Sequence, residues 1–395
     1  MRLHQTIIII FIAFAAAACG WGGNREQDPS AGRTANSYHR NTAGTGTTLQ
    51  STVARGFDVT EHDGYRVVNV YNPWQGARNE KLSYILAGRD AKLPGDLPPG
   101  KVIRTPVRSV ICLSTTHIAM LDAIGETESI SAVSGTRLVY NSRLRQRIES
   151  GKVPDIGYDA NLDYEKIVEI NPDVILAYSV DAGSSAWLDR LTDLGLTVVM
   201  LGEYLETTPL AQAGWLKFVA HLFDKQKKAS CILAETEKEY KRLASKAEDA
   251  GYRPVVISGL PWRNSWFVPG GRSHFASLVA DAGGRYLWDS NRGRENFPVD
   301  IESVISRGRE ADYWINTGTA RSAADIVDTD PRLKSLPPFI MSNIYNNNAL
   351  LSIHGGNDYW ESGIVSPHII LSDLISILHP SLMPDHELVY YRKLK

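Results

Sequence analysis

Apolar and polar positions alternate in blocks along most of this sequence, and the blocks predict strands and helices in turn. Short apolar runs at 110–113 and 174–177 have the unbroken hydrophobic character of parallel strands that are covered on both faces. Between such runs, apolar residues recur at helical spacing, as Tyr164, Ile167 and Val168 do. Strands that alternate with helices in this way predict βαβ units and an α/β fold class.

One phrase occurs twice in the α/β part of the sequence. Residues 163–178, DYEKIVEINPDVILAY, and residues 300–316, DIESVISRGREADYWIN, both predict a short helix followed by a strand. Each copy opens with an aspartate, Asp163 or Asp300, and carries a glutamate two positions later. The second copy is longer, so the repeat is approximate. We therefore predict two α/β lobes in which the phrase forms the same element of each.

A long helical segment lies between the two lobes in the sequence. Helix-favouring residues continue from 209 to about 250, with a charged interruption at 224–225. We assign 209–225 to a single bridging helix, 108–208 to an N-terminal α/β lobe and 226–395 to a C-terminal α/β lobe.

The residues ahead of these lobes have a different pattern. Residues 64–88 alternate like a small antiparallel strand pair, with the turn residues Asn72, Pro73 and Gly76 between the two strands. This pattern predicts an N-terminal β extension over 55–107.

The first residues have the layout of an export signal. Arg2 precedes an apolar run at 7–18, which is too short for a permanent membrane span. The alanines before Cys19 resemble the lipobox of bacterial lipoproteins, which implies a signal peptide over 1–19 and a lipidated Cys19 that anchors the mature protein to a membrane. An ordinary signal peptide that is cut elsewhere is the alternative. Residues 20–54 are poor in aliphatic side chains and predict a flexible tether.

Composition narrows the function classes. The net charge is −2 and 22% of the residues are charged, which gives no basic surface for nucleic acid. Cys112 and Cys231 could form a disulfide in an oxidising compartment, but two buried unpaired thiols are the favoured interpretation. The sequence has no CxxC, HExxH or GxSxG motif, which argues against the common zinc sites and hydrolases.

Longer segments resemble the substrate-binding proteins of ABC importers for ferric siderophores, haem and vitamin B12. The resemblance spans about residues 106 to 390 and rests on RSVICLSTTHIAMLDAIG, IGYDANLDYEKIVEINPDVILAY, WFVPGGRSHFASLVADAGGRYLWDS and DIESVI. It implies two Rossmann-like lobes joined by a single long helix, with a metal chelate or corrinoid in the cleft between them. It also implies a monomer without a resident cofactor, lipid-anchored in the periplasm or cell envelope, that delivers its ligand to a permease dimer with an ATPase.

The loops after parallel strands face such a cleft, and large planar chelates need aromatic walls. The resemblance matches Tyr178 and Phe267 to aromatic positions that line the pocket in vitamin B12 members. Core packing is an equal alternative for Tyr178 and Trp266, and the favoured one for Trp288. The candidate wall residues are Tyr140, Tyr178, Trp262, Trp266 and Phe267.

Five polar residues near the expected cleft loops could contact a ligand. His117, at a predicted helix start, could reach a metal's axial position, although a capping or core role is the commoner one, and the same holds for His274. Arg137, Arg263 and Arg272 could pair with ligand carboxylates or phosphate, or they could be solvated surface residues.

The repeated glutamates, Glu165 and Glu302, have two interpretations. An acidic residue in the first turn of a helix stabilises the helix dipole. The resemblance adds that one acidic residue on each lobe docks onto arginines of the permease, and Glu302 matches the position in the second lobe. In the first lobe the docking residue is either Glu165 or Asp181.

Two other function classes stay open at this point. A metal-cluster or chelatase-type enzyme on a related fold would need Cys or His ligands that converge in the cleft, and we expect neither catalytic nor metal-ligating residues. A haemophore or sensor would bind the same ligands without a permease.

Overall fold

Two α/β lobes with the same strand order make up most of the structure. The computed structural model describes residues 47–50, 54–158, 161–180, 185–262 and 265–395. Lobe 1 is built on a parallel sheet of order β7-β6-β8-β9, and lobe 2 on the order β13-β10-β15-β16, to which β17 adds an antiparallel edge. The strands of lobe 1 are β6 (Val110–Cys112), β7 (Ile130–Val133), β8 (Val174–Ala177) and β9 (Val198–Met200). Those of lobe 2 are β10 (Val255–Ser258), β13 (Arg285–Tyr286), β15 (Tyr313–Ile315), β16 (Ile344–Asn346) and β17 (Arg392–Lys393).

Helices connect the parallel strands of each lobe, as the βαβ pattern predicts. A small antiparallel sheet is attached to lobe 2 and consists of β11 (Pro261–Trp262), β12 (Ser265–Val268) and β14 (Phe297–Val299). The helices of lobe 1 are α1 (Thr115–Ile124), α2 (Ser142–Glu149), α3 (Tyr164–Ile170) and α4 (Ser185–Asp193). Those of lobe 2 are α8 (His274–Asp281), α9 (Ile301–Arg307), α10 (Ala323–Thr329), α11 (Pro337–Ile340) and α12 (Pro367–Leu378).

The repeated phrase forms the same element in both lobes. Asp163 caps α3 and Asp300 caps α9, because each carboxylate accepts a hydrogen bond from a backbone N–H in the first helical turn. The aspartates that precede β8 and β15 also act alike. Asp173 accepts from the backbone N–H of Arg108 just before β6, and Asp312 from that of Val255 in β10, both at 2.7 Å. The contacts of Asp173 and Asp312 thus hold β8 and β15 against the first strand of their own lobe.

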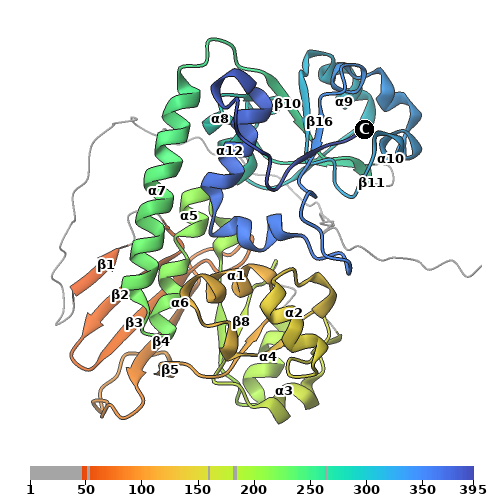
Figure 1. The fold of residues 1–395 in the computed structure, drawn as a ribbon. Helices are drawn as coiled ribbons and strands as arrows, with labels where there is room; N and C mark the ends of the chain where they lie inside the picture. The colour runs from red at the N-terminus through yellow and green to blue at the C-terminus, as the bar shows by residue number, and fades with distance from the viewer. Residues whose placement is uncertain (1–46, 51–53, 159–160, 181–184, 263–264) are drawn as a thin grey trace, which may run out of the picture. The chain divides into compact units, whose positions relative to one another are not determined.

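The long helix between the lobes lies later in the chain than the sequence pattern predicts. Residues 209–225 hold two short helices, α5 (Pro209–Ala213) and α6 (Leu216–Leu222), whereas the longest helix of the described residues is α7 (Gln226–Glu248). Ala229 of α7 belongs to the core of lobe 1, and Leu243 belongs to that of lobe 2. Figure 1 shows α7 running past α6 towards α8 and α12. The bridging role therefore belongs to α7.

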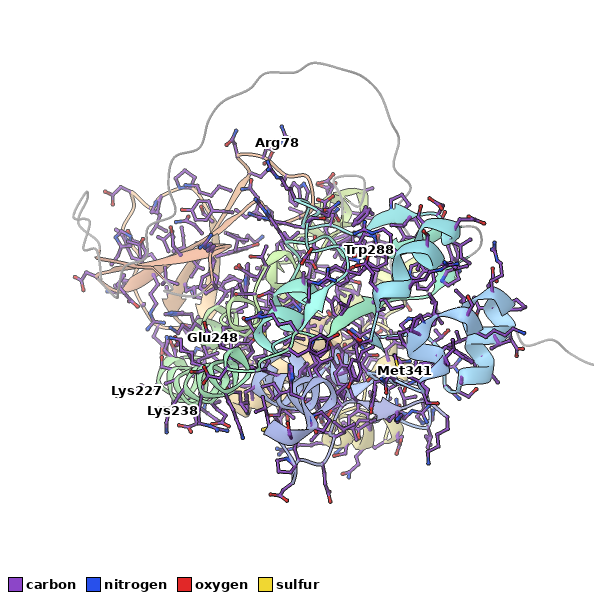
Figure 2. The ribbon with its side chains drawn as sticks, turned by 90° about the horizontal axis from the view of Figure 1, so that it is seen from above. Arg78, Lys227, Lys238, Glu248, Trp288 and Met341 are labelled. Carbon is purple, nitrogen blue, oxygen red and sulfur yellow. The ribbon has the colours of Figure 1, made fainter. Side chains whose placement is uncertain are left out.

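The outer face of α7 is charged and exposed. Lys227, Lys238 and Glu248 are exposed and are labelled along this helix in Figure 2. The helix thus buries one stripe against both cores and leaves the other in solvent, as an amphipathic surface helix does.

A second segment also joins the two cores. It consists of two short 3₁₀ helices, η8 (Asp358–Trp360) and η9 (Ser362–Ile364), which lead into α12. Tyr359 belongs to the core of lobe 2, while Ile364 and Val365 belong to that of lobe 1. The lobes are therefore connected by this segment as well as by α7.

The N-terminal β extension is larger than the predicted strand pair. β3 and β4 pair antiparallel as predicted, with Asn72 and Gly76 at positive φ between them. The sheet continues on both sides in the order β1-β2-β3-β4-β5, and β5 lies parallel to β4. One face packs on Trp215 and Phe218 of lobe 1. The strands are β1 (Thr47–Gln50), β2 (Phe57–His62), β3 (Tyr65–Tyr71), β4 (Lys81–Gly88) and β5 (Lys101–Thr105).

The structure shows the state of two of the three cysteines. Cys112 and Cys231 are unpaired, and Cys112 is buried, but Cys231 is exposed on α7, so the prediction of two buried thiols is wrong for Cys231. Cys19 lies outside the described residues. Within the described part of the chain, no helix combines the length and apolar character that a membrane span requires.

Candidate functional site

Aromatic rings gather where the strands of lobe 1 end. Tyr178 directly follows β8, and Tyr204 follows β9 in the short 3₁₀ helix η5 (Glu203–Leu205). The two rings meet edge to face with centroids 6.3 Å apart, and the hydroxyl oxygens of Tyr178 and Tyr158 lie 3.3 Å apart. We call Tyr158, Tyr178 and Tyr204 the lobe 1 wall. Its position matches the rule that loops at the carboxyl ends of parallel strands carry the ligand site.

A buried polar pair lies next to this wall. His117 is 0% exposed, its ring lies 6.4 Å from that of Tyr178, and its Nε2 is 3.9 Å from Oε1 of Glu203. The same carboxylate oxygen accepts a hydrogen bond of 2.7 Å from the hydroxyl of Thr116. Burial lowers the pKa of His117 to about 3 and raises the pKa of Glu203. The pair therefore supports the wall from inside the lobe.

Loops from both lobes present exposed apolar side chains near their strand ends. Leu138 follows β7, Trp262 follows β10, and Ile353 follows β16. Trp360 of η8 is also exposed, and its carbonyl oxygen accepts a hydrogen bond from the hydroxyl of Thr115 at the start of α1. Exposed large apolar side chains around strand-end loops are typical of a surface that binds a partly apolar ligand.

One buried carboxylate holds the segment of η8 and η9 against lobe 1. Glu361, which is 2% exposed, accepts hydrogen bonds from the backbone N–H groups of Tyr140 and Asn141, both at 2.8 Å. Burial, with a smaller effect of the nearby carboxylates of Asp358 and Asp122, raises the pKa of Glu361 to about 7. The contact spans 220 positions of sequence and reaches the start of α2.

A cavity of about 1050 Å³ lies beside this contact. Its lining comes from α1, α7, the start of α2, the loop after β16, the segment around η8 and η9 and the start of α12, and it includes Tyr140, Ile353 and Glu361. Tyr178, Trp262 and Phe267 are outside the lining. The acidic lining residues are Asp122, Glu235, Glu239, Asp358 and Glu361.

A model of a known family matches the region that contains both lobes. The model, described as periplasmic binding protein, covers residues 110–345, more than half of the chain. The chain belongs to the periplasmic binding protein family. Members of this family are the solute-binding proteins of ABC importers, so the family resemblance seen in the sequence is confirmed.

Two curated relatives of this periplasmic binding protein come from Methanocaldococcus jannaschii and are named uncharacterized lipoproteins. One is 25% identical over 351 residues, which cover 82% of this chain and 81% of the relative. The other is 25% identical over 327 residues, which cover 79% of this chain and 80% of the relative.

Solved structures with the same fold include three binding proteins. A periplasmic haem-binding protein from Roseiflexus sp. RS-1 has a TM-score of 0.54 at 19% identity, over 70% of this chain and 99% of that one. A periplasmic haem-binding protein from Pseudomonas aeruginosa has a TM-score of 0.54 at 15% identity, over 70% and 94%. A periplasmic vitamin B12 binding protein from Vibrio cholerae has a TM-score of 0.50 at 13% identity, over 71% and 99%. These matches confirm the predicted two-lobed α/β fold.

The predicted wall residues of lobe 2 differ in their burial. Trp266 is 0% exposed, donates a hydrogen bond of 2.9 Å to the carbonyl of Ser258 and stacks on Trp314, and these contacts favour its core role over a place in the ligand wall. Trp288 is buried in the same core, as expected. Phe267 is half-buried on the opposite face of β12, because successive side chains of a strand point to opposite faces.

The predicted polar residues are distributed over both lobes. Arg137 is exposed in the loop after β7, whereas the full burial of His117 favours its core role. His274 begins α8, and burial lowers its pKa to about 4. Arg272 lines a separate cavity of about 440 Å³ on lobe 2, and Arg263 lies outside the described residues.

The repeated glutamates are both exposed at the second position of their helices. Glu302 pairs with Arg332 at 2.8 Å, and this hydrogen bond lowers the pKa of Glu302. Glu165 is exposed on α3, and Asp181 lies outside the described residues. The choice between Glu165 and Asp181 as the docking residue of the first lobe stays a prediction.

Sequence reasoning missed Tyr204, Trp360 and Glu361. Tyr204 could have been found, since it follows β9 closely and Tyr178 follows β8. No local pattern marks Trp360 or Glu361, because their contacts to lobe 1 join residues more than 200 positions apart. In the described part of this periplasmic binding protein, no group of three or more His, Cys, Asp or Glu side chains is arranged to hold a metal ion.

Proposed function

We propose that this protein is the substrate-binding lipoprotein of an ABC importer and captures a metal chelate, such as a ferric siderophore or haem, or cobalamin in the cleft between its lobes. The observation that carries this proposal is the lobe 1 wall, because its aromatic rings lie at the strand ends where the fold places ligands. Aromatic faces suit the large planar surface of such ligands. The haem-binding and vitamin B12 binding proteins that share the fold support the same ligand class.

Delivery and anchoring complete the proposal. A lipid on Cys19 would hold the protein at the membrane beside its permease, and the two relatives named lipoproteins support this anchor. Glu302, with Glu165 or Asp181 as its counterpart, would dock onto arginines of the permease subunits. The protein would act by binding and release, without catalysing a reaction.

A binding screen with a matched pair of variants tests the proposal. Haemin, cyanocobalamin and ferrichrome are titrated into the purified protein by isothermal calorimetry. At least one is expected to bind, and Tyr178→Ala is expected to weaken binding about 5- to 30-fold, as the loss of one aromatic contact does. Tyr252→Ala, which changes an exposed tyrosine on lobe 2, serves as the control and should bind like wild type.

The calorimetric titrations have one outcome that supports the proposed site and two that contradict it. Binding that weakens in Tyr178→Ala alone supports the site. Absence of binding for all three ligands, or equal affinity of the Tyr178→Ala variant and wild type, would contradict it.

A further inference from the structure

We propose that the N-terminal β extension is a scaffold that fixes the lobe 1 wall. The positioning residues are Tyr84 of the extension and Glu206 of lobe 1. This inference rests on the proposed function, since it concerns the wall of the same ligand site. Three contacts from the extension reach the loops that carry Tyr178 and Tyr204.

The first contact sets the end of β9. Tyr84 of β4 is buried, and its hydroxyl oxygen accepts a hydrogen bond of 2.9 Å from the backbone N–H of Met200. Met200 is the last residue of β9, and Tyr204 follows four positions later. β9 is the edge strand of its sheet, and the phenol gives the buried backbone N–H of Met200 a partner on the outer side of that strand, so it holds the strand end where the loop begins.

The second contact holds the other end of the same loop. Glu206 is buried two positions after Tyr204, and one of its carboxylate oxygens accepts three hydrogen bonds. Two come from the backbone N–H groups of Arg55 and Gly56 at the start of the extension, at 2.9 and 3.0 Å, and one from the indole of Trp215 at 3.1 Å. The loop with Tyr204 is thus clamped by the extension on both sides.

The third contact reaches the residue next to Tyr178. The loop between β3 and β4 forms a parallel β-bridge from Trp74 to Ser179. The carbonyl oxygen of Ser179 also accepts a hydrogen bond from the hydroxyl of Tyr204. The loops that carry Tyr178 and Tyr204 are therefore tied to a sheet that lies outside the two lobes.

The comparisons separate the extension from the common fold. The family model covers residues 110–345, so it begins after the extension. The lipoprotein relative matches 82% of the chain, about 324 residues, which is about 38 more than 110–395 contains. Relatives of this kind share part of the extension, although the family model leaves it out. A feature that is added to the fold and grips its ligand loops fits a positioning role.

A pair of tyrosine variants tests the role of Tyr84. Tyr84→Phe removes the hydrogen bond to Met200, and Tyr240→Phe is the control. Tyr240 of α7 is a buried tyrosine whose hydroxyl donates a 2.7 Å hydrogen bond to Asp281 in lobe 2. Both variants are expected to lower the melting temperature to a similar extent, but only Tyr84→Phe should weaken binding of haemin, cyanocobalamin or ferrichrome, by about tenfold.

Two further measurements separate positioning from general stability. Amide hydrogen exchange of residues 201–205 in the ligand-free protein should be at least about tenfold faster in Tyr84→Phe than in Tyr240→Phe. Glu206→Gln keeps an acceptor oxygen and should bind nearly like wild type, whereas Glu206→Ala should lose affinity. This pair of variants decides the question if Tyr84→Phe fails to fold.

The outcomes separate this inference from the proposed function. If wild type binds none of the three ligands, the proposed function fails, while the exchange rates of 201–205 still decide whether the extension fixes the wall. If wild type binds, but Tyr84→Phe and Glu206→Ala bind as tightly as the controls and exchange is unchanged, the scaffold is wrong and the proposed function stands.

Discussion

Replacing Glu361 by glutamine is expected to make the stability of the protein less dependent on pH. The carboxylate is buried between the lobes and accepts two backbone hydrogen bonds, which favour its charged form. Burial and the neighbouring carboxylates of Asp358 and Asp122 outweigh these bonds and raise the pKa of Glu361 from 4.5 to about 7. The folded protein therefore holds a proton on Glu361 that the unfolded chain releases at lower pH.

The sign and size of the effect follow from this shift. Below pH 4.5 the group is protonated in both states. Between pH 4.5 and about 7 the unfolded chain binds fewer protons than the folded protein, so the free energy of unfolding falls as the pH rises. At about 1.4 kcal/mol for each pKa unit, the loss is on the order of 3 kcal/mol above pH 7. Glutamine does not ionise, so the variant lacks this loss.

Urea denaturation at several pH values from 4.5 to 8.5 measures the difference. The free energy of unfolding of wild type minus that of Glu361→Gln should fall by about 3 kcal/mol across this range. Glu165→Gln, which changes an exposed glutamate, should give a profile parallel to that of wild type. Parallel profiles for wild type and Glu361→Gln would show that the buried carboxylate has an ordinary pKa and that the account of the contact between the lobes is wrong.

Three further predictions concern other parts of the chain. Trp266→Ala should lower the free energy of unfolding by about 3–5 kcal/mol in urea denaturation, since it opens a large cavity in the core of lobe 2, and a loss below 1 kcal/mol would place the ring outside the core. Glu302→Lys should abolish ligand uptake by cells while affinity in solution stays at the wild-type level, and uptake at the wild-type rate would remove the docking role. Cys19→Ala should shift the protein from the membrane fraction to the soluble fraction or leave the precursor uncut, and unchanged fractionation would exclude the lipid anchor.

Local patterns predicted the elements whose contacts are local. The aspartates Asp163 and Asp300 cap their helices through hydrogen bonds that span three positions, and any sequence with this spacing can be recognised. The repeat also accounts for one matching strand pair in the two lobes, because the strand of each copy pairs with the first strand of its lobe.

The position of the bridging helix depended on burial that the local pattern does not contain. Asp224 has a positive φ of 54° and separates α6 from α7, so the charged interruption was a real helix boundary. Which of the two helical segments joins the lobes is decided by tertiary contacts, and those belong to Ala229 and Leu243. A helix-by-helix prediction cannot rank the two segments, since both favour helix.

The aromatic residues of the second lobe show the same limit for strands. Trp266 and Phe267 are neighbours in sequence and equally suited to a ligand wall, but they point to opposite faces of β12. Packing on Trp314, about fifty positions away, covers the face that carries Trp266. Tyr178 directly follows β8, so its strand-end position, together with the family resemblance, made it a candidate wall residue in the sequence.

A crystal structure of the protein with the chelate that binds in the calorimetric screen tests the central claim most directly. We predict that the ligand lies between the lobes, in contact with Tyr178 or Tyr204 on one side and with the strand-end loops of lobe 2 on the other. A ligand that lies away from the lobe 1 wall, for example in the acidic cavity beside Glu361, would contradict the account.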